Sequence, residues 1–269
     1  LTRLLNDVGN DFDQLPLLQH AMMRTWDAWV ERGQPNEPIN LEDYLKIGTM
    51  SESLSQHANE AYNELDTDRK KQICEQLFKA LTDRAADVRG TRRPRSVKDL
   101  MLLTESGKEE LVEVINIFRK PGRTFLMPPA DIALAESTII DISHESLMRI
   151  WDKLKIWTKE EAQDAELYKR MADQSVREAN GQGSLWSDPE LSLALKWMAK
   201  FNQNEERVTI WASVFNKDTA LALDFLKRSK ERDFSLKLKH EAQEKEIEKA
   251  RRRSRWTIFY SIRVGVTAG

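Results

Sequence analysis

The first hydrophobic pattern in the chain predicts helices that each bury one face. A helix that carries Pro16 in its first turn, where proline is tolerated, is expected to end near Gly33. Its apolar stripe recurs every three or four residues. The members of that stripe are Leu18, Met22, Trp26 and Trp29. Asn40 is expected to cap a short helix, and a longer helix is predicted from Ser51 to Leu65.

In the middle of the chain the pattern changes from helical to strand periodicity. Three helical segments are followed by two runs that are typical of strands, and we expect those runs to pair as a hairpin. The helical segments start at Asp68, Val97 and Gly107, and the strands are Thr124–Met127 and Thr138–Ile142. This is the order of elements in a winged helix, so residues 68–157 are predicted to form one.

The last third of the chain is again helical. One helix is predicted over Lys159–Asn180, and Asp188–Pro189 is expected to open the next. From Glu205 to about Arg255 the sequence has no Gly or Pro, which indicates one or two long helices. Lys230–Lys249 is almost entirely charged, and its apolar positions are too sparse for a strong heptad. A solvated helix is therefore favoured over a coiled coil.

The stretch Ile139–Trp151 predicts a strand that turns directly into a helix, since three isoleucines precede an amphipathic segment. Ser143 is expected to cap that helix, with His144 in its first turn and Leu147 on its buried face. Free backbone N–H groups at such a junction can bind an anion such as a phosphate. The plainer alternative is a capped turn with a histidine on the surface. His57, by contrast, has no partner at ligand spacing and is interpreted as a surface or packing residue.

Composition supports a mainly α protein and narrows its chemistry. Of 269 residues, 32% are charged and only 18 are Gly or Pro (10 and 8), so few positions break helices. The net charge of −2 gives no general reason to expect nucleic-acid binding. The single cysteine, Cys74, excludes an intrachain disulfide and fits a reducing compartment. With no initiator Met or signal peptide, the chain is expected to be an excised fragment.

Common catalytic motifs are missing from the sequence. His144-Glu145 begins like a zinc-protease motif, but Met148 stands where the second histidine ligand would be. We find neither a GxSxG nucleophile elbow nor a GxxxxGK[ST] phosphate loop. We therefore expect this fragment alone to hydrolyse nothing.

Two motifs carry a family resemblance. The segment Ile142–Leu147 (ISHESL), followed by Arg149-Ile150-Trp151, resembles the signature that closes the winged-helix part of bacterial STAND-class NTPases. These are signal-transduction ATPases with numerous domains, here of the novel STAND type that is often fused to WD-repeat propellers. Upstream, Leu15–Ala21 (LPLLQHA) is similar to the segment that opens the lid subdomain of the same family. The motifs stand in the expected order.

The resemblance implies a nucleotide site shared with sequence upstream of this chain. ADP or ATP, with Mg²⁺ held by the upstream phosphate-loop core, would be gripped between that core and this fragment. In the family a proline of the lid motif lies against adenine and a histidine of the winged helix reaches the β-phosphate. The matching residues are Pro16 and His144, although Gln14 stands where many relatives have Gly. The parent protein is thus expected to be an ATPase that can oligomerise on activation and carries a downstream sensor such as a propeller.

The predicted organisation has five parts. They are a helical lid (1–66), a winged helix (67–157), a helical subdomain (158–229), a charged helix or linker (230–255) and the start of a transmembrane or interfacial segment (256–269). In that end, the basic cluster Arg251–Arg255 precedes Trp256–Ile262, which is typical of the cytoplasmic flank of a membrane span or of an interfacial helix. A cytoplasmic protein anchored to the inner face of the membrane is expected.

Two other functions remain open. A winged-helix DNA-binding regulator would use the basic residues of the middle region, but its groove helix carries Glu109, Glu110 and Glu113 against one Lys108. The basic residues in question are Arg92, Arg93, Arg95, Arg119, Lys120 and Arg123. A purely structural helical adaptor is the third reading.

Overall fold

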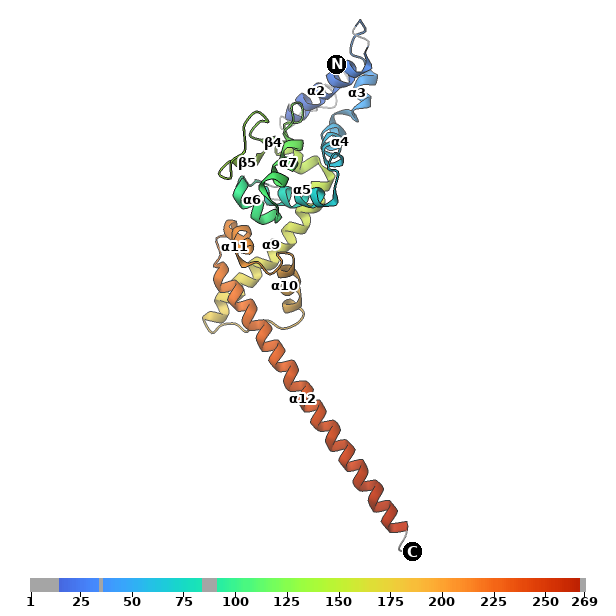
Figure 1. The fold of residues 1–269 in the computed structure, drawn as a ribbon, viewed down its shortest axis with the longest axis vertical. Coiled ribbons are helices and arrows are strands. Elements are labelled where there is room, and N and C mark those ends of the chain that lie inside the picture. The colour runs from blue at the N-terminus through green and yellow to red at the C-terminus, as the bar shows by residue number, and fades with distance from the viewer. Residues whose placement is uncertain (1–14, 34–35, 84–90, 267–269) are drawn as a thin grey trace. The chain divides into compact units, whose positions relative to one another are not determined.

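The structure is a computed structural model, and it describes residues 15–33, 36–83 and 91–266. The chain divides into two compact units (Figure 1). Unit 1 comprises residues 1–167 and 209–214, and unit 2 comprises residues 168–208 and 215–269. The first boundary between the units, after Leu167, lies within the helix Asp152–Ala179 and therefore comes later than the predicted limit between residues 157 and 158. The other predicted domain limits stay predictions.

Unit 1 is built mainly from helices, as predicted. They are α2 (Leu15–Arg32), α3 (Leu41–Lys46), α4 (Thr49–Asn63), α5 (Asp68–Ala80), α6 (Val97–Thr104), α7 (Lys108–Phe118), α8 (Ser146–Ile150) and the first part of α9 (Asp152–Ala179). The predicted cap at Asn40 is confirmed, because its side chain accepts from the N–H groups of Glu42 and Asp43. Thr67 caps α5 by accepting from Lys70 N–H.

A three-stranded antiparallel sheet contains the predicted hairpin, which follows α7 and is confirmed. β4 (Leu126–Met127) and β5 (Ile139–Ile142) pair with Leu126 opposite Ile142, in the order β3-β5-β4. The strands are shorter than predicted because Thr124 has a positive φ and Thr138 closes a turn onto Ala135 N–H. β3 (Arg95–Ser96) was not predicted. A second small sheet pairs β1 (Thr82–Asp83) with β2 (Thr91–Arg92).

The core of unit 1 is an aromatic cluster around Trp151. Phe78 and Phe118 meet edge to face with ring centroids 4.9 Å apart, and Trp151 lies 5.0 Å from Phe78. All three side chains are fully buried. The indole N–H of Trp151 donates to Asn59 Oδ1 at 2.9 Å, so this large ring leaves no buried donor unpaired. The cluster therefore joins α4, α5 and α7 to the chain that follows α8.

Helix α2 buries a different stripe from the one predicted. Met22 and Trp26 are each 54% exposed, so the expected apolar stripe does not face the core. The buried positions lie one residue earlier: Leu17, Ala21, Thr25 and Ala28. The partner helix α4 also buries small residues, Ala58 and Ala61. Small side chains allow two helices to approach closely, and they outweigh the larger apolar residues in deciding which face packs.

One buried arginine holds the loop between β4 and β5. Arg119 Nη1 donates to the carbonyls of Pro129 and Ile132, both at 2.9 Å, and to that of Pro128 at 3.3 Å. Its Nε donates to Asn116 Oδ1 at 2.7 Å. Side chains within the loop are mostly exposed. The hydrogen bonds from Arg119 therefore hold the loop in place, since the loop has little buried core of its own.

In the described part of unit 2, all regular elements are helices. They are the remainder of α9, α10 (Glu190–Ala199), α11 (Glu205–Ala212, shared with unit 1) and α12 (Thr219–Val266), with the short 3-10 helix η2 (Ser213–Phe215) between the last two. Tyr168, Trp197 and Phe225 form its buried core. Arg228 holds Glu178 with two hydrogen bonds of 2.7 and 2.8 Å, which fixes α12 against α9.

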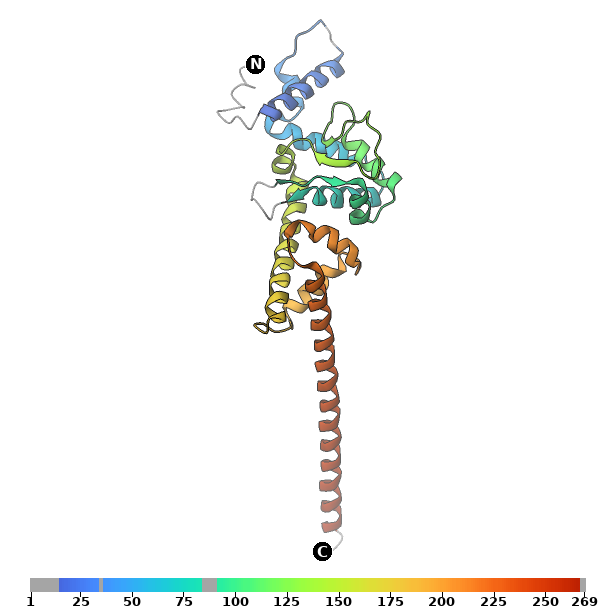
Figure 2. The same ribbon diagram turned by 90° about the vertical axis from the view of Figure 1, so that its left-hand side faces the viewer.

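Helix α12 is one continuous helix of 48 residues (Figure 2). Side chains from residue 230 to 252 are almost all exposed, which agrees with the predicted solvated helix. In the part of the chain that the structure describes, no helix combines the length and apolar content needed to cross a membrane. Side chains after residue 252 lie outside the described part. The predicted membrane or interfacial segment at 256–269 therefore stays a prediction.

Candidate functional site

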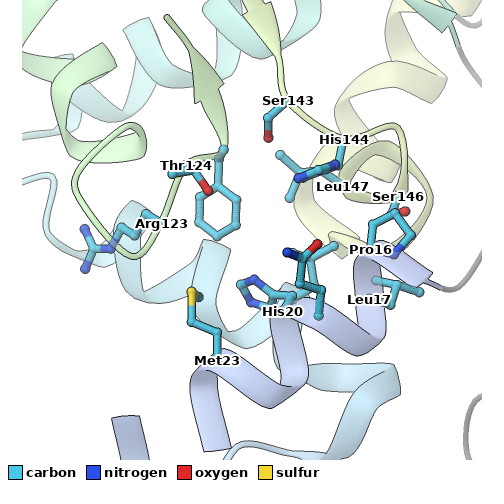
Figure 3. Close-up of a pocket in the computed structure, with 13 residues that line it drawn as sticks. Pro16, Leu17, His20, Met23, Arg123, Thr124, Ser143, His144, Ser146 and Leu147 are labelled. Atoms are coloured by element: carbon cyan, nitrogen blue, oxygen red, sulfur yellow. The ribbon is translucent and has the colours of Figure 1, made fainter. Parts of the chain in front are cut away.

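A pocket of about 280 Å³ in unit 1 brings the two motifs of the sequence together (Figure 3). Pro16 reaches it from α2, and His144 reaches it from the turn between β5 and α8. Its full lining is Pro16, Leu17, Gln19, His20, Met23, Leu54, Arg123, Thr124, Phe125, Ser143, His144, Ser146 and Leu147. Two residues that lie far apart in the chain thus share one cavity.

His144 is placed by a turn and not by a capped helix. Helix α8 begins only at Ser146, and no side chain caps it, so the predicted Ser143 cap is wrong. The helix has five residues and ends at Ile150, and the extended backbone of Trp151 separates α8 from α9. Few aligned peptides give little dipole, so α8 adds little to anion binding. On this side of the pocket the polar groups are therefore those of the side chains, namely Ser143, His144 and Ser146.

The imidazole of His144 is exposed and borders the pocket. Partial desolvation by its surroundings lowers its pKa below the usual value, and repulsion from the Arg92 guanidinium adds to that shift. His144 is therefore neutral at pH 7. A neutral imidazole has one N–H donor and one acceptor nitrogen, so it can donate a hydrogen bond to an oxygen in the pocket.

Helix α2 forms the opposite wall of the pocket, and three of its lining side chains stand at helical spacing. Pro16, His20 and Met23 stand at i, i+4 and i+7 of the helix and all line the cavity. In Figure 3 they rise from α2, while Thr124, Ser143 and His144 approach from the other side. We call these three residues the α2 wall. The sequence signal that could have revealed His20 was its spacing of one turn from Pro16.

His20 is held from beneath by His57. The Nε2 of His20 lies 3.3 Å from Nδ1 of His57, and the two rings are 5.1 Å apart. The backbone of Ser53 acts on the His20 ring as well, in the direction that raises its pKa, but this effect is smaller than that of burial. His57 is only 4% exposed, so the packing interpretation is confirmed, but its partner 37 residues away was not foreseen.

Both rings of this pair are neutral. Burial, followed by repulsion from Arg24, lowers the pKa of His20 to about 4 and that of His57 to about 3. Phe125 packs edge-on against His57 with centroids 5.1 Å apart. An uncharged, hydrogen-bonded ring therefore lies at the base of the pocket.

The nearest guanidinium on the pocket wall is already paired. Arg123 forms an ion pair with Glu64 and donates to the carbonyl of Ile117 at 3.2 Å. Lys120 Nζ contacts the other oxygen of Glu64 at 2.7 Å. Hydrogen bonds from Arg123 and Lys120 lower the pKa of Glu64 to about 2. An anionic ligand would have to compete with Glu64 for Arg123.

The basic residues that suggested DNA binding are largely occupied. Arg92 pairs with Asp141 at 3.0 Å, Arg119 is buried on loop carbonyls, and Lys120 and Arg123 share Glu64. Arg93 and Arg95 are buried. DNA binding rests on cations that are free to neutralise phosphates. These contacts speak against the DNA-binding alternative.

Among the described residues, no three His, Cys, Asp or Glu side chains are grouped so that they could hold a metal ion.

Comparison with known proteins agrees with the two motifs. The sequence model of one family, described as Novel STAND NTPase 1, matches residues 1–182, which includes every residue of the pocket. No similar chain was found among curated proteins or among solved structures. Since the match spans well over half of the sequence, this chain belongs to the Novel STAND NTPase 1 family.

Proposed function

We propose that the pocket is one half of a nucleotide site and that this chain is the regulatory part of a STAND signalling NTPase. The observation that carries the proposal is that Pro16 and His144 line the same cavity. Pro16 would lie against the adenine of ADP or ATP, and His144 would donate to the β-phosphate. The phosphate loop and Mg²⁺ would belong to an upstream core.

The size and lining of the pocket support this division. Ligand pockets usually enclose about 300–1,000 Å³, so a cavity of about 280 Å³ suits part of a nucleotide better than the whole. Apolar side chains such as Pro16 and Leu17 suit a base. The hydroxyls of Ser143 and Ser146, beside His144, suit phosphate oxygens.

The order of elements in unit 1 supports the coupling role. The chain runs α5–β1–β2–β3–α6–α7–β4–β5, which we interpret as a winged helix, and His144 is the second residue after the last strand. A nucleotide held by both an upstream core and His144 would keep the two parts closed. The ADP-bound closed state would then be the resting state, and release would signal to downstream sensor or membrane-associated parts.

The test is His144→Leu in the longer protein that carries the phosphate loop. A hydrogen bond to a charged group contributes about 1.5–3 kcal/mol, so its loss should weaken ADP retention by roughly 10- to 150-fold. ADP that remains bound after gel filtration is measured beside the melting temperature without nucleotide. Weaker retention with an unchanged melting temperature supports the proposal.

A matched control is Glu145→Gln, which changes an exposed neighbour that does not line the pocket. It should leave ADP retention as it is. If His144→Leu also retains ADP fully, the proposed role of His144 is wrong.

A further inference from the structure

One ring nitrogen of His20 already has a hydrogen-bonding partner within the protein. The Nε2 of His20 lies 3.3 Å from Nδ1 of His57. An imidazole has only two ring nitrogens, and one of them already has His57 as its partner. The ring also lines the pocket, where its aromatic surface can contact a ligand.

The position of His20 places that ring surface next to Pro16. The two residues are one helical turn apart on α2, and both line the pocket. Figure 3 shows His20 between Pro16 and Met23 along the same helix, on the side that faces the cavity. The α2 wall is therefore a continuous surface of uncharged groups.

Such a surface suits a flat, aromatic ligand group. A neutral aromatic ring attracts another ring through offset or edge-to-face contact, whereas it offers no charge to a phosphate. The lowered pKa of His20 keeps the ring uncharged at physiological pH. The opposite wall carries the polar side chains of Ser143 and His144.

We propose that His20 is a base-stacking residue that extends the contact surface of Pro16, and that His57 fixes its ring in place. This inference rests on the proposed nucleotide-binding function and adds the residue that distinguishes a nucleotide from a bare phosphate anion. The base lies on α2, and the phosphates face the turn that carries His144.

The variants His20→Leu and His20→Phe test this in the full-length protein. Both remove the ring nitrogens and fill similar space, so both lose the contacts with His57 and Ser53; only Phe keeps an aromatic ring. Aromatic contact adds about 0.5–1.5 kcal/mol beyond area burial, so the Phe variant should bind ADP roughly 2- to 12-fold more tightly than the Leu variant. Affinity for inorganic pyrophosphate should be the same in both.

Met22→Ala is the control on the same helix, because Met22 is exposed and does not line the pocket. It should not change ADP affinity. Equal ADP affinity of the Leu and Phe variants, or an equal effect on pyrophosphate, overturns the stacking role.

A second measurement uses the unaltered protein, so it does not depend on the variants folding. With histidine labelled for NMR, ADP should shift the His20 ring protons upfield, and pyrophosphate should not. Absence of that shift while ADP is bound also overturns the inference. If the wild-type protein binds no ADP, the proposed function itself fails. If His144→Leu loses ADP while the two His20 variants bind it equally, only the stacking role fails.

Discussion

Helices α7 and α2 use their apolar residues in opposite ways. On α7, Leu111, Val114, Ile115 and Phe118 are fully buried. On α2 the buried positions are mostly small, while Met22 and Trp26 are more than half exposed. Both helices are amphipathic by sequence. Helix α7 buries its large apolar side chains in the core of unit 1, whereas α2 leaves two of its largest exposed.

This difference between the two helices indicates that α7 serves mainly the stability of unit 1 and that α2 serves mainly the pocket. A fully buried aromatic side chain contributes several kilocalories per mole, so α7 and its neighbours carry the stability of unit 1. Helix α2 contributes less to that core and instead presents Pro16 and His20 to the pocket. We therefore expect core and pocket substitutions to affect different measurements.

The largest effect is expected for Phe118→Ala. Its ring is fully buried against Phe78 at 4.9 Å and Trp151 at 5.9 Å, and the substitution leaves a cavity. Such changes cost about 3–5 kcal/mol. Urea unfolding should show the loss as a lower midpoint with an unchanged slope. A cost below about 1 kcal/mol would mean that the α7 core is not the stabilising region.

A pH-dependent effect is expected next, in the contact between α2 and α4. His20 and His57 have pKa values lowered from 6.5 to about 4 and about 3, so only the unfolded chain takes up their protons between pH 6.5 and 4. Stability is therefore independent of these groups above pH 6.5 and falls as the pH drops below it. At pH 5 the loss is about 2 kcal/mol per histidine.

Unfolding at pH 7 and pH 5 measures this loss, and His57→Phe should remove about half of it. Glu64 contributes little to the comparison, because pH 5 still lies above the ordinary carboxyl pKa of 4.5, so this group is mostly ionised in both the folded and the unfolded chain. An identical pH dependence in the variant would show that the buried pair is not its source.

The smallest effect is expected for Trp26→Ala on the exposed side of α2. Trp26 is 54% exposed, and its ring contacts Trp29 with centroids 4.9 Å apart. Surface substitutions usually change stability by no more than about 0.5 kcal/mol. A loss comparable to that of Phe118→Ala, measured by the same urea titration, would erase the contrast between α2 and α7.

Local signals in the sequence were sufficient for most elements. Asn40, Thr67 and Gly107 stand where helices begin, and these starts follow from side-chain or backbone chemistry within a few residues. β3 was missed because Arg95–Ser96 is too short to show alternation. The buried face of α2 was misjudged because two overlapping stripes, one large and one small, have the same period.

For the site, the sequence named Pro16 and His144 through the family motifs, and both residues line the pocket. It could not name His57 as the support of His20, since that contact joins residues 37 positions apart and depends on how α2 meets α4. Likewise, the pairing of Arg123 with Glu64 depends on tertiary packing and not on spacing.

Arg119 allows the sequence of the β4–β5 loop to vary while the path of its backbone stays the same. Arg119 donates to backbone carbonyls, which every amino acid provides. The exposed loop positions, such as Asp131 and Glu136, can therefore accept many residue types without changing the path of the loop. In a library of variants, sequence diversity should gather in that loop, while Arg119 itself should tolerate almost no replacement.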